Sequence, residues 1–314
     1  MIKLCVVGEG AFGNKHLEAL KKIENVDVSW LIGGVETSTK SVAEHHNIPN
    51  WSCNLNDALN SSEIDGIILT SPTPIHASQA KQVMLAGKHL LVEIPMADNI
   101  EDAVELVEIQ KKTDVIAMAG HIRRFNPSHQ WIHNKIQCGE LKIQQLEAQT
   151  HFFRRTNTNA KGEARSWTDN LLWHHACHTV DLFQYQTDQS IEHCFALQGP
   201  IHPELGIPMD MSIGLKATDG AICNLSLSFN SDGPLGTKFR YICDNGTYIA
   251  HYDQLFDGSG KEIDLGDLAL LGDGVELIDR EFINAIKTGK EPNASLVQCL
   301  KAMHTLDKLQ KVIC

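Results

Sequence analysis

The sequence predicts two domains: an α/β domain with a parallel, doubly wound sheet, then an α+β domain with an open, mainly antiparallel sheet. Three observations predict this order. Short apolar runs alternate with helical patterns in the first 120 residues, a glycine-rich turn follows the first apolar run, and strands of period two begin after about residue 140. The 314 residues are enough for two domains.

The first domain is expected over residues 1–121. Near-continuous apolar runs, typical of strands buried on both faces, lie at residues 2–7, 26–32, 66–69, 89–92 and 115–118. Helical patterns lie between them at residues 12–22, 38–46, 76–86 and 99–112. Because parallel neighbours need long crossover connections, strands that alternate with helices predict a parallel sheet.

The second domain is expected over residues 122–314. Its strands are predicted at residues 147–153, 192–197, 209–216, 221–230, 239–243 and 248–252. Alternation of apolar and polar residues puts one face of such strands on a core and leaves the other polar. Asn245-Gly246 between the last two strands predicts a type I′ hairpin turn. Helices predicted at residues 274–288 and 294–312 close the chain.

Composition and charge narrow the class of protein. Hydrophobic content of 42% with 21% charged residues is typical of a folded globular protein, and no apolar run approaches the roughly 20 residues of a membrane helix. The net charge of −12 argues against nucleic acid and membrane surfaces as partners. Nine scattered cysteines and the lack of a signal peptide predict free thiols in the cytoplasm. The polar outer face of residues 221–230 favours a homodimer.

A G-x-G-x-x-G motif directly follows the first predicted strand and opens a helix. Gly8 allows a tight turn, Gly10 lets the backbone approach a pyrophosphate, and Gly13 lets helix and strand pack closely. The helix that follows begins with Ala11 and Phe12, and its free N–H groups favour phosphate. The motif in this context predicts a Rossmann domain that binds a nicotinamide dinucleotide.

The end of the second predicted strand bears on which dinucleotide binds. An NAD site usually has Asp or Glu there to hold the ribose hydroxyls. Here the strand tip carries no acid, and Gly33 and Gly34 leave space. The groups that could contact a 2′-phosphate are Thr37, Ser38 and Lys40. NADP is therefore favoured as the cofactor, with NAD as the alternative.

The arginines are unevenly placed. The chain has seven, and five of them fall between positions 123 and 165. Arginine suits bidentate contact with carboxylate or phosphate, so the cluster is either an anion site or a chance grouping on a solvated surface. The five candidates are Arg123, Arg124, Arg154, Arg155 and Arg165.

Residues 173–183, WHHACHTVDLF, form the second candidate site. On a helix His174, His178 and Asp181 share one face. A zinc site of the two histidines with Cys177 or Asp181 lacks support from any other Cys/His cluster, and a solvated polar face is the bland alternative. We favour a histidine that accepts a proton beside a nicotinamide, with Asp181 orienting the ring and no metal involved.

Taken together, the glycine motif, Glu93-Ile94-Pro95, Arg124–Pro127 and the His-x-x-Asp helix resemble the glucose–fructose oxidoreductase/inositol dehydrogenase family over essentially the whole chain. The resemblance implies hydride transfer between NAD(P) and a sugar-like alcohol or hemiacetal that lies between cofactor and open sheet, with His178 as the catalytic histidine. It also implies that the cofactor contacts Thr70, Ser71, Pro72, His76, Glu93 and Pro95. Two positions depart from the family: Ile94 stands where it usually has lysine, and His174 where it usually has aspartate.

Residues 123–136, 152–183 and 198–213 resemble one subfamily much more closely. Its members use NADP to oxidise the cyclic hemiacetal of a muconic semialdehyde dicarboxylate to a pyrone dicarboxylate in protocatechuate 4,5-cleavage. A small dicarboxylate substrate would explain arginines clustered in an acidic protein, and an aspartate at position 174 would repel it. The alternatives are a sugar or cyclitol dehydrogenase and a dinucleotide-binding sensor without catalysis.

Overall fold

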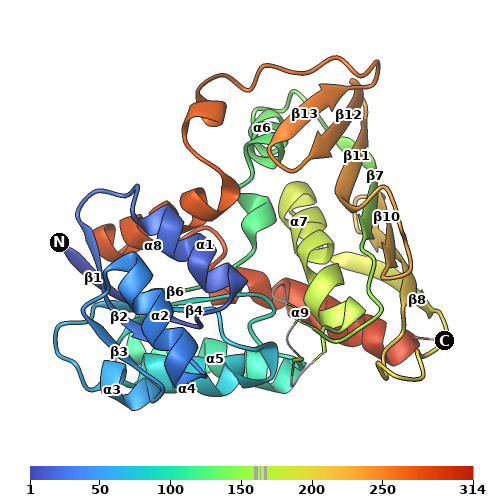
Figure 1. Cartoon of the computed structure of the whole chain (residues 1–314). Coiled ribbons are helices and arrows are strands. Elements are labelled where there is room, and N and C mark those ends of the chain that lie inside the picture. The colour runs from blue at the N-terminus through green and yellow to red at the C-terminus, as the bar shows by residue number, and fades with distance from the viewer. Residues whose placement is uncertain (159–161, 163, 166–167, 314) are drawn as a thin grey trace. The chain divides into compact units, whose positions relative to one another are not determined.

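The computed structural model describes residues 1–158, 162, 164–165 and 168–313. The chain forms two compact units (Figure 1): residues 1–120 with 275–300, and residues 121–274 with 301–314. The sequence analysis assigned everything after residue 121 to the second domain, whereas Val275–Leu300 packs with the first unit. The reason is an apolar contact: a Cβ at Gly66, on a central strand, would lie 3.2 Å from the side chains of Phe282 and Ile286.

The first unit contains a six-stranded, all-parallel sheet in the order β3-β2-β1-β4-β5-β6. This is the strand order of the dinucleotide-binding Rossmann fold, as predicted. Its strands are β1 (Ile2–Val7), β2 (Val26–Ile32), β3 (Asn50–Ser52), β4 (Gly66–Leu69), β5 (His89–Val92) and β6 (Ala117–Ala119). Its helices are α1 (Ala11–Leu20), α2 (Glu36–His46), α3 (Leu55–Leu59), α4 (His76–Leu85), α5 (Ile100–Thr113) and α8 (Gly274–Thr288).

The strand order reverses between β1 and β4. Beyond β1 the sheet continues through β2 to β3, and beyond β4 it continues in the other direction through β5 to β6. In an open parallel sheet, ligands bind outside the carboxyl ends of the strands at this point. Gly8 directly follows β1, Thr70 follows β4 and Glu93 follows β5. Three of the predicted cofactor segments therefore lie at the same edge of the sheet. The sequence analysis missed β3 and α3, because three and five residues are too few to show a period.

The second unit contains a seven-stranded sheet in the order β13-β12-β11-β7-β10-β9-β8. Only β7 and β10 pair in parallel, so the sheet is mainly antiparallel, as predicted. Its strands are β7 (Ile143–His151), β8 (Ile191–Gln198), β9 (Asp210–Ala217), β10 (Ile222–Ser228), β11 (Gly236–Cys243), β12 (Gly246–His251) and β13 (Gln254–Asp257). The predicted hairpin forms, with Cys243 paired to Gly246, but its turn is not type I′: φ is positive at Gly246 (156°) and at neither Asp244 nor Asn245.

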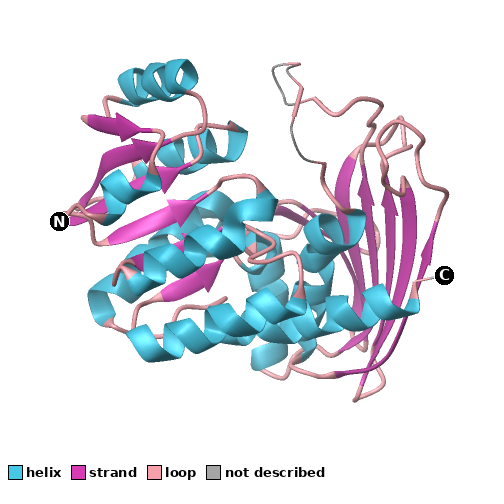
Figure 2. Ribbon diagram, turned by 90° about the horizontal axis from the view of Figure 1, so that it is seen from below, coloured by secondary structure: helices cyan, strands magenta, loops and turns pink. Residues whose placement is uncertain are grey.

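Helices cover one face of this sheet (Figure 2). They are α6 (Pro127–Gln137), α7 (Cys177–Thr187) and the end of α9 (Leu296–Val312). Along β11, Phe239 and Tyr241 are fully buried, whereas Lys238 and Arg240 are exposed. The sequence analysis missed α6, although Pro at the first helical position is a recognised start signal. Among the described residues, no helix combines the length and apolar character needed to cross a membrane.

Candidate functional site

The glycine turn of the first unit fits a dinucleotide by its shape. Gly8 has φ 117°, and a Cβ there would lie 2.6 Å from the carbonyl oxygen of Thr70. A Cβ at Gly13 would lie 1.8 Å from the carbonyl oxygen of Gly8. At Gly10 an added Cβ would meet no atom within 4 Å, so the backbone at the start of α1 is open to a pyrophosphate. Ala11 and Phe12 form the first positions of that helix.

The turn after β4 is tied to the loop after β5. Thr70 Oγ1 donates to a backbone carbonyl of β1 at 2.9 Å, and Ser71 Oγ donates to the side chain of Gln79. One ring nitrogen of His76 lies 2.6 Å from the carbonyl oxygen of Ser71 and the other 2.9 Å from that of Pro95. His76 therefore holds the two loops together. Pro72 leads from this turn into a short 3₁₀ helix.

The corner after β2 contains a carboxylate that the sequence analysis missed. Gly34 N lies 3.1 and 3.0 Å from the two carboxylate oxygens of Glu9, which also accepts from Val35 N and Ser38 Oγ, each at 3.1 Å. A Cβ at Gly33 would come within 2.8 Å of the same carboxylate. Further side chains exposed along α2 are those of Thr37 and Lys40. The acid that β2 lacks at its tip is thus supplied by the glycine turn.

A buried chain of charged groups lies behind Glu93. His16 Nε2 is 3.1 Å from Glu93 Oε1, and His16 Nδ1 is 2.7 Å from Asp279 Oδ1. Burial lowers the pKa of His16, but the charges and hydrogen bonds of Asp279 and Glu93 outweigh it and raise the pKa to about 10. His16 is therefore an imidazolium at neutral pH. Ile94, which stands where the family has lysine, is buried, so His16 is the cation beside Glu93.

His178 of the second unit has the properties of a base. Its Nδ1 is buried and makes no hydrogen bond with any described residue. Burial first, and then the charge of Arg123 and three nearby histidines, hold the pKa of His178 well below its usual value. The ring is therefore neutral at pH 7 and able to accept a proton. The ring of His121, which the sequence analysis did not single out, lies 6.5 Å away between centroids.

Asp181 has a different partner from the expected one. Its carboxylate accepts two short hydrogen bonds from Arg124, Nε–Oδ2 at 2.7 Å and Nη2–Oδ1 at 2.6 Å, and His121 Nδ1 lies 3.4 Å from it. Both members of the Arg124–Asp181 pair are buried. Asp181 thus fixes Arg124 and His121 instead of orienting His178. The Arg124 guanidinium is held in this internal ion pair, which argues against the substrate contact proposed for Arg124.

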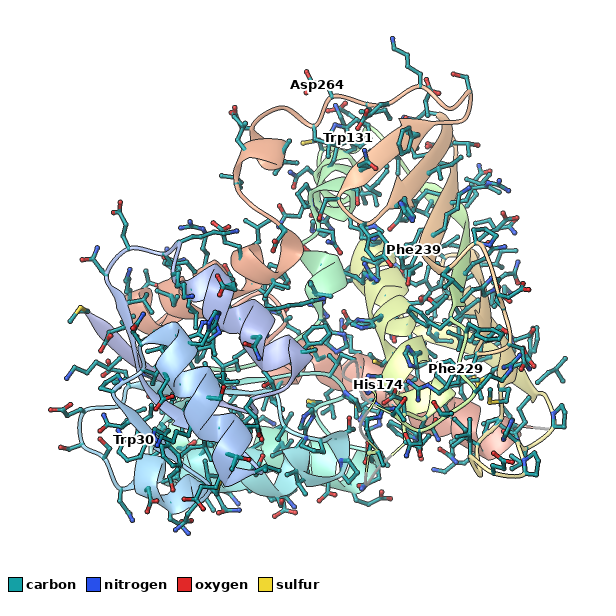
Figure 3. The ribbon with its side chains drawn as sticks, in the orientation of Figure 1. Trp30, Trp131, His174, Phe229, Phe239 and Asp264 are labelled. Atoms are coloured by element: carbon teal, nitrogen blue, oxygen red, sulfur yellow. The ribbon has the colours of Figure 1, made fainter. Side chains whose placement is uncertain are left out.

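The helix carrying the histidines starts with a π-helical segment, Leu171–Ala176, before α7. The sequence analysis expected a regular helix here, and a π-helical turn is wider than an α-turn. His174 lies beside His175, with ring centroids 4.9 Å apart, and His175 packs against Phe229 at 5.1 Å. Figure 3 labels His174 and Phe229.

Asp169 lies at the centre of a second group of charged side chains. Its carboxylate forms ion pairs with Arg154 and, at 3.2 Å, with Arg165, and His175 Nε2 lies 3.8 Å away. Burial raises the pKa of Asp169, but hydrogen bonding to His175 and the charges of His174 and Arg154 outweigh it and hold the pKa low. Two guanidinium groups therefore form ion pairs with the Asp169 carboxylate. Asp169 is a further residue that the sequence analysis missed.

The other two arginines differ sharply in their surroundings. The Arg123 guanidinium lies 5.2 Å from the centroid of the Tyr252 ring, and its nearest polar side-chain partner is Asn126 at 3.4 Å. Within the part of the chain that the structure describes, Arg123 forms no ion pair, and burial lowers its pKa. Arg155 is exposed and donates to Asn230 Oδ1 at 3.0 Å. Arg123 is therefore the arginine best placed to receive an anion.

The geometry does not assemble the zinc set considered above. Among the described residues, three groups have possible metal-ligating atoms within 4.8 Å of one another. One contains Asp169, His174 and His175, another includes His121 and Asp181, and the third contains Glu18, His45 and His46, so none of them contains His178. Cys177 is buried and its thiol donates to the carbonyl oxygen of His174. The arrangement supports proton transfer at His178 and anion binding by arginine.

Both halves of the chain match models of known protein families. Residues 2–121 match the oxidoreductase family with an NAD-binding Rossmann fold, and residues 127–269 match the C-terminal domain of bacterial oxidoreductases. The chain is 52% identical over 98% of both chains to 4-carboxy-2-hydroxymuconate-6-semialdehyde dehydrogenase of Sphingobium sp. (strain NBRC 103272 / SYK-6). It is 23% identical, over 83% of its length and 73% of the relative's, to myo-inositol 2-dehydrogenase of Thermotoga maritima.

Solved structures share the fold. UDP-N-acetylglucosamine 3-dehydrogenase from Acidithiobacillus ferrooxidans matches with a TM-score of 0.84 at 18% identity, over 99% of this chain and 97% of that one. GenD2 from gentamicin A biosynthesis, solved in complex with NAD, matches with a TM-score of 0.82 at 17% identity, over 99% and 93%. With these matches the chain belongs to the glucose–fructose oxidoreductase/inositol dehydrogenase (Gfo/Idh/MocA) family and is an NAD(P)-dependent dehydrogenase.

Proposed function

We propose that the chain oxidises the cyclic hemiacetal of 4-carboxy-2-hydroxymuconate-6-semialdehyde to 2-pyrone-4,6-dicarboxylate, with NADP as cofactor, in protocatechuate 4,5-cleavage. The observation that carries the proposal is a neutral His178 whose Nδ1 has no hydrogen-bond partner among the described residues, together with a nearby buried Arg123 that forms no ion pair with them. The 52% identity to a semialdehyde dehydrogenase of that name supports the same substrate.

The proposed reaction transfers a hydride to the cofactor and a proton to His178. When bound, the nicotinamide accepts the hydride from the hemiacetal carbon. His178 accepts the proton of the hemiacetal hydroxyl, and the C–O bond becomes the carbonyl of the lactone. The protonated ring then stands near the cationic Arg123, which favours release of the proton to solvent and restores the neutral base.

Two arginine groups suit the two carboxylates of this substrate. Arg123 is buried and forms no ion pair with a described residue, so a substrate carboxylate would compensate a charge that the fold leaves uncompensated. Arg154 forms an ion pair with Asp169, but its Nη1 is buried without a hydrogen-bond partner among the described residues, so it could donate to a second carboxylate. A sugar or cyclitol carries no carboxylate for either group. This difference favours the dicarboxylate over the sugar substrates of other family members.

The first unit would hold the cofactor at three places. The backbone at Gly10 and the start of α1 suit the pyrophosphate, and the Thr70 turn and the Glu93 loop lie at the same edge of the sheet. NADP is proposed because the donors at the start of α2, which include Ser38 Oγ, suit a 2′-phosphate once the Glu9 carboxylate moves away, and the side chains of Thr37 and Lys40 are exposed beside them. Two copies are proposed to associate through the open face of the second unit's sheet, where Phe195 and Leu197 are exposed.

The direct test is absorbance at 340 nm with purified protein, NADP, and the ring-cleavage product of protocatechuate made in situ by a 4,5-dioxygenase. Rapid NADPH formation is expected, and myo-inositol with either cofactor should give none. His178→Asn serves as the matched control, because it keeps the size of the side chain and removes the base. Turnover of myo-inositol without turnover of the ring-cleavage product would contradict the proposal.

A further inference from the structure

Glu9 occupies the corner of the first unit where the adenosine ribose of a dinucleotide binds in this fold. Its carboxylate accepts hydrogen bonds from Gly34 N, Val35 N and Ser38 Oγ at 3.0–3.1 Å. Among the described residues, no lysine or arginine forms an ion pair with Glu9, and Lys40 is paired with Glu44. Two backbone N–H groups and one hydroxyl therefore converge on an anion that the chain itself provides.

This corner suits either of two ligand groups. A 2′-phosphate could accept hydrogen bonds from all three donors, because its three terminal oxygens are strong acceptors. It could do so only if the Glu9 carboxylate no longer occupies that position. A free ribose 2′-hydroxyl could instead donate to the carboxylate where it stands, which is the usual function of the acid at the tip of the second strand. A phosphate and the carboxylate in one place would repel each other.

We propose that Glu9 sets the choice between NADP and NAD, in that its carboxylate must leave the Gly34–Ser38 donors before a 2′-phosphate can bind them. The inference rests on the cofactor part of the proposed function. Glu9 then weakens the binding of NADP and supports that of NAD, taking the place of an acid at the tip of β2. The relevant residue lies 25 positions before Gly34 in the sequence.

The test is fluorescence titration of the unmodified protein and of Glu9→Ala with NADPH and with NADH, which needs no substrate. Glu9→Ala should lower the Kd for NADPH at least tenfold and leave the Kd for NADH equal or higher, so that the ratio of the two constants changes tenfold or more. Glu36→Ala is the matched control, since it removes one negative charge at the start of the same helix without touching the three donors. It should change the ratio less than threefold.

Two results would overturn the inference. One is a ratio unchanged by Glu9→Ala, and the other is an equal change with Glu36→Ala, which would reflect charge alone. Glu9→Gln keeps the side chain's length and should move the ratio in the same direction by a smaller factor, so a folding defect of the alanine variant does not decide the outcome. Because the titration omits the substrate, it is independent of whether the chain oxidises the proposed hemiacetal.

Discussion

Replacing Asp279 by Asn should destabilise the first unit strongly, although the change is nearly isosteric. Asp279 lies on α8 and its carboxylate is 2.7 Å from His16 Nδ1, with both side chains fully buried. The amide can still accept the hydrogen bond but no longer balances the imidazolium charge. His16 then depends on Glu93 alone, 3.1 Å away on its other side.

The magnitude follows from the pKa of His16. Its rise from 6.5 to about 10 is equivalent to about 5 kcal/mol of favourable interaction with the charged ring. Asp279 contributes the larger part of that rise, and breaking one partner of a buried ion pair costs about 3–5 kcal/mol. We therefore expect Asp279→Asn to lower the free energy of unfolding by about 3 kcal/mol at pH 7.

Urea unfolding, followed by tryptophan fluorescence, measures this loss. Trp30, labelled in Figure 3, and Trp51 both report on the first unit. Because the folded-state pKa of His16 is raised, its stabilisation is fully present below pH 6.5 and is lost as the pH rises through about 10. The difference between the two proteins should therefore be largest below about pH 6.5 and shrink steadily as the pH rises to about 10.

Glu105→Gln is the matched control in the same unit. Glu105 forms an exposed ion pair with Lys81, and such pairs contribute at most about 1 kcal/mol. Equal losses for Glu105→Gln and Asp279→Asn would refute the reasoning. So would a loss for Asp279→Asn that stays constant from pH 7 to pH 10, because His16 would then not be the group whose charge Asp279 stabilises.

Four further predictions concern the second unit. His178→Asn should lower turnover about 10²–10⁴-fold while the Kd for NADPH, measured by fluorescence, stays unchanged; normal turnover would show that another group is the base. Because the pKa of His178 lies well below 6.5, kcat should not fall from pH 8 to pH 6.5 through its protonation, and a pH profile centred near pH 7 would speak against it. Arg123→Lys should raise KM at least about tenfold with a smaller effect on kcat, since lysine cannot make bidentate contacts; steady-state kinetics would show the reverse pattern if Arg123 does not bind substrate. Asp181→Asn should lower the free energy of unfolding by about 3–5 kcal/mol, because it removes the carboxylate that forms a buried ion pair with Arg124; a loss below about 1 kcal/mol in urea unfolding would contradict this.

Most of the fold could be predicted from local sequence patterns. The apolar runs at β1, β2, β4 and β5 predicted those strands with the same bounds as in the structure, because strands buried on both faces are rich in apolar residues. The glycine motif predicted its own geometry, since positive φ at Gly8 and the close approach at Gly13 are requirements of one short turn. Where a segment is too short for a period, as in β3, sequence reasoning had no signal.

The candidate site was predicted less completely, because its groups come from distant parts of the chain. The sequence identified His178 and the arginines as residue types suited to the chemistry. It could not show that Arg124 pairs with Asp181, 57 positions away, or that Arg123 has no such partner among the described residues. The sequence also did not predict the π-helical segment that contains His174.

The sequence by itself determined the two sheets, the glycine turn, and the histidine and arginine types available for catalysis and anion binding, because these depend on neighbours within a few residues. Only the tertiary structure decided which charges are compensated. Glu9 reaches the corner after β2, and Asp279 returns from α8 to hold His16 beside Glu93. Ion pairs and hydrogen bonds act over a few ångströms, and which side chains come within that range is fixed by the topology of the folded chain.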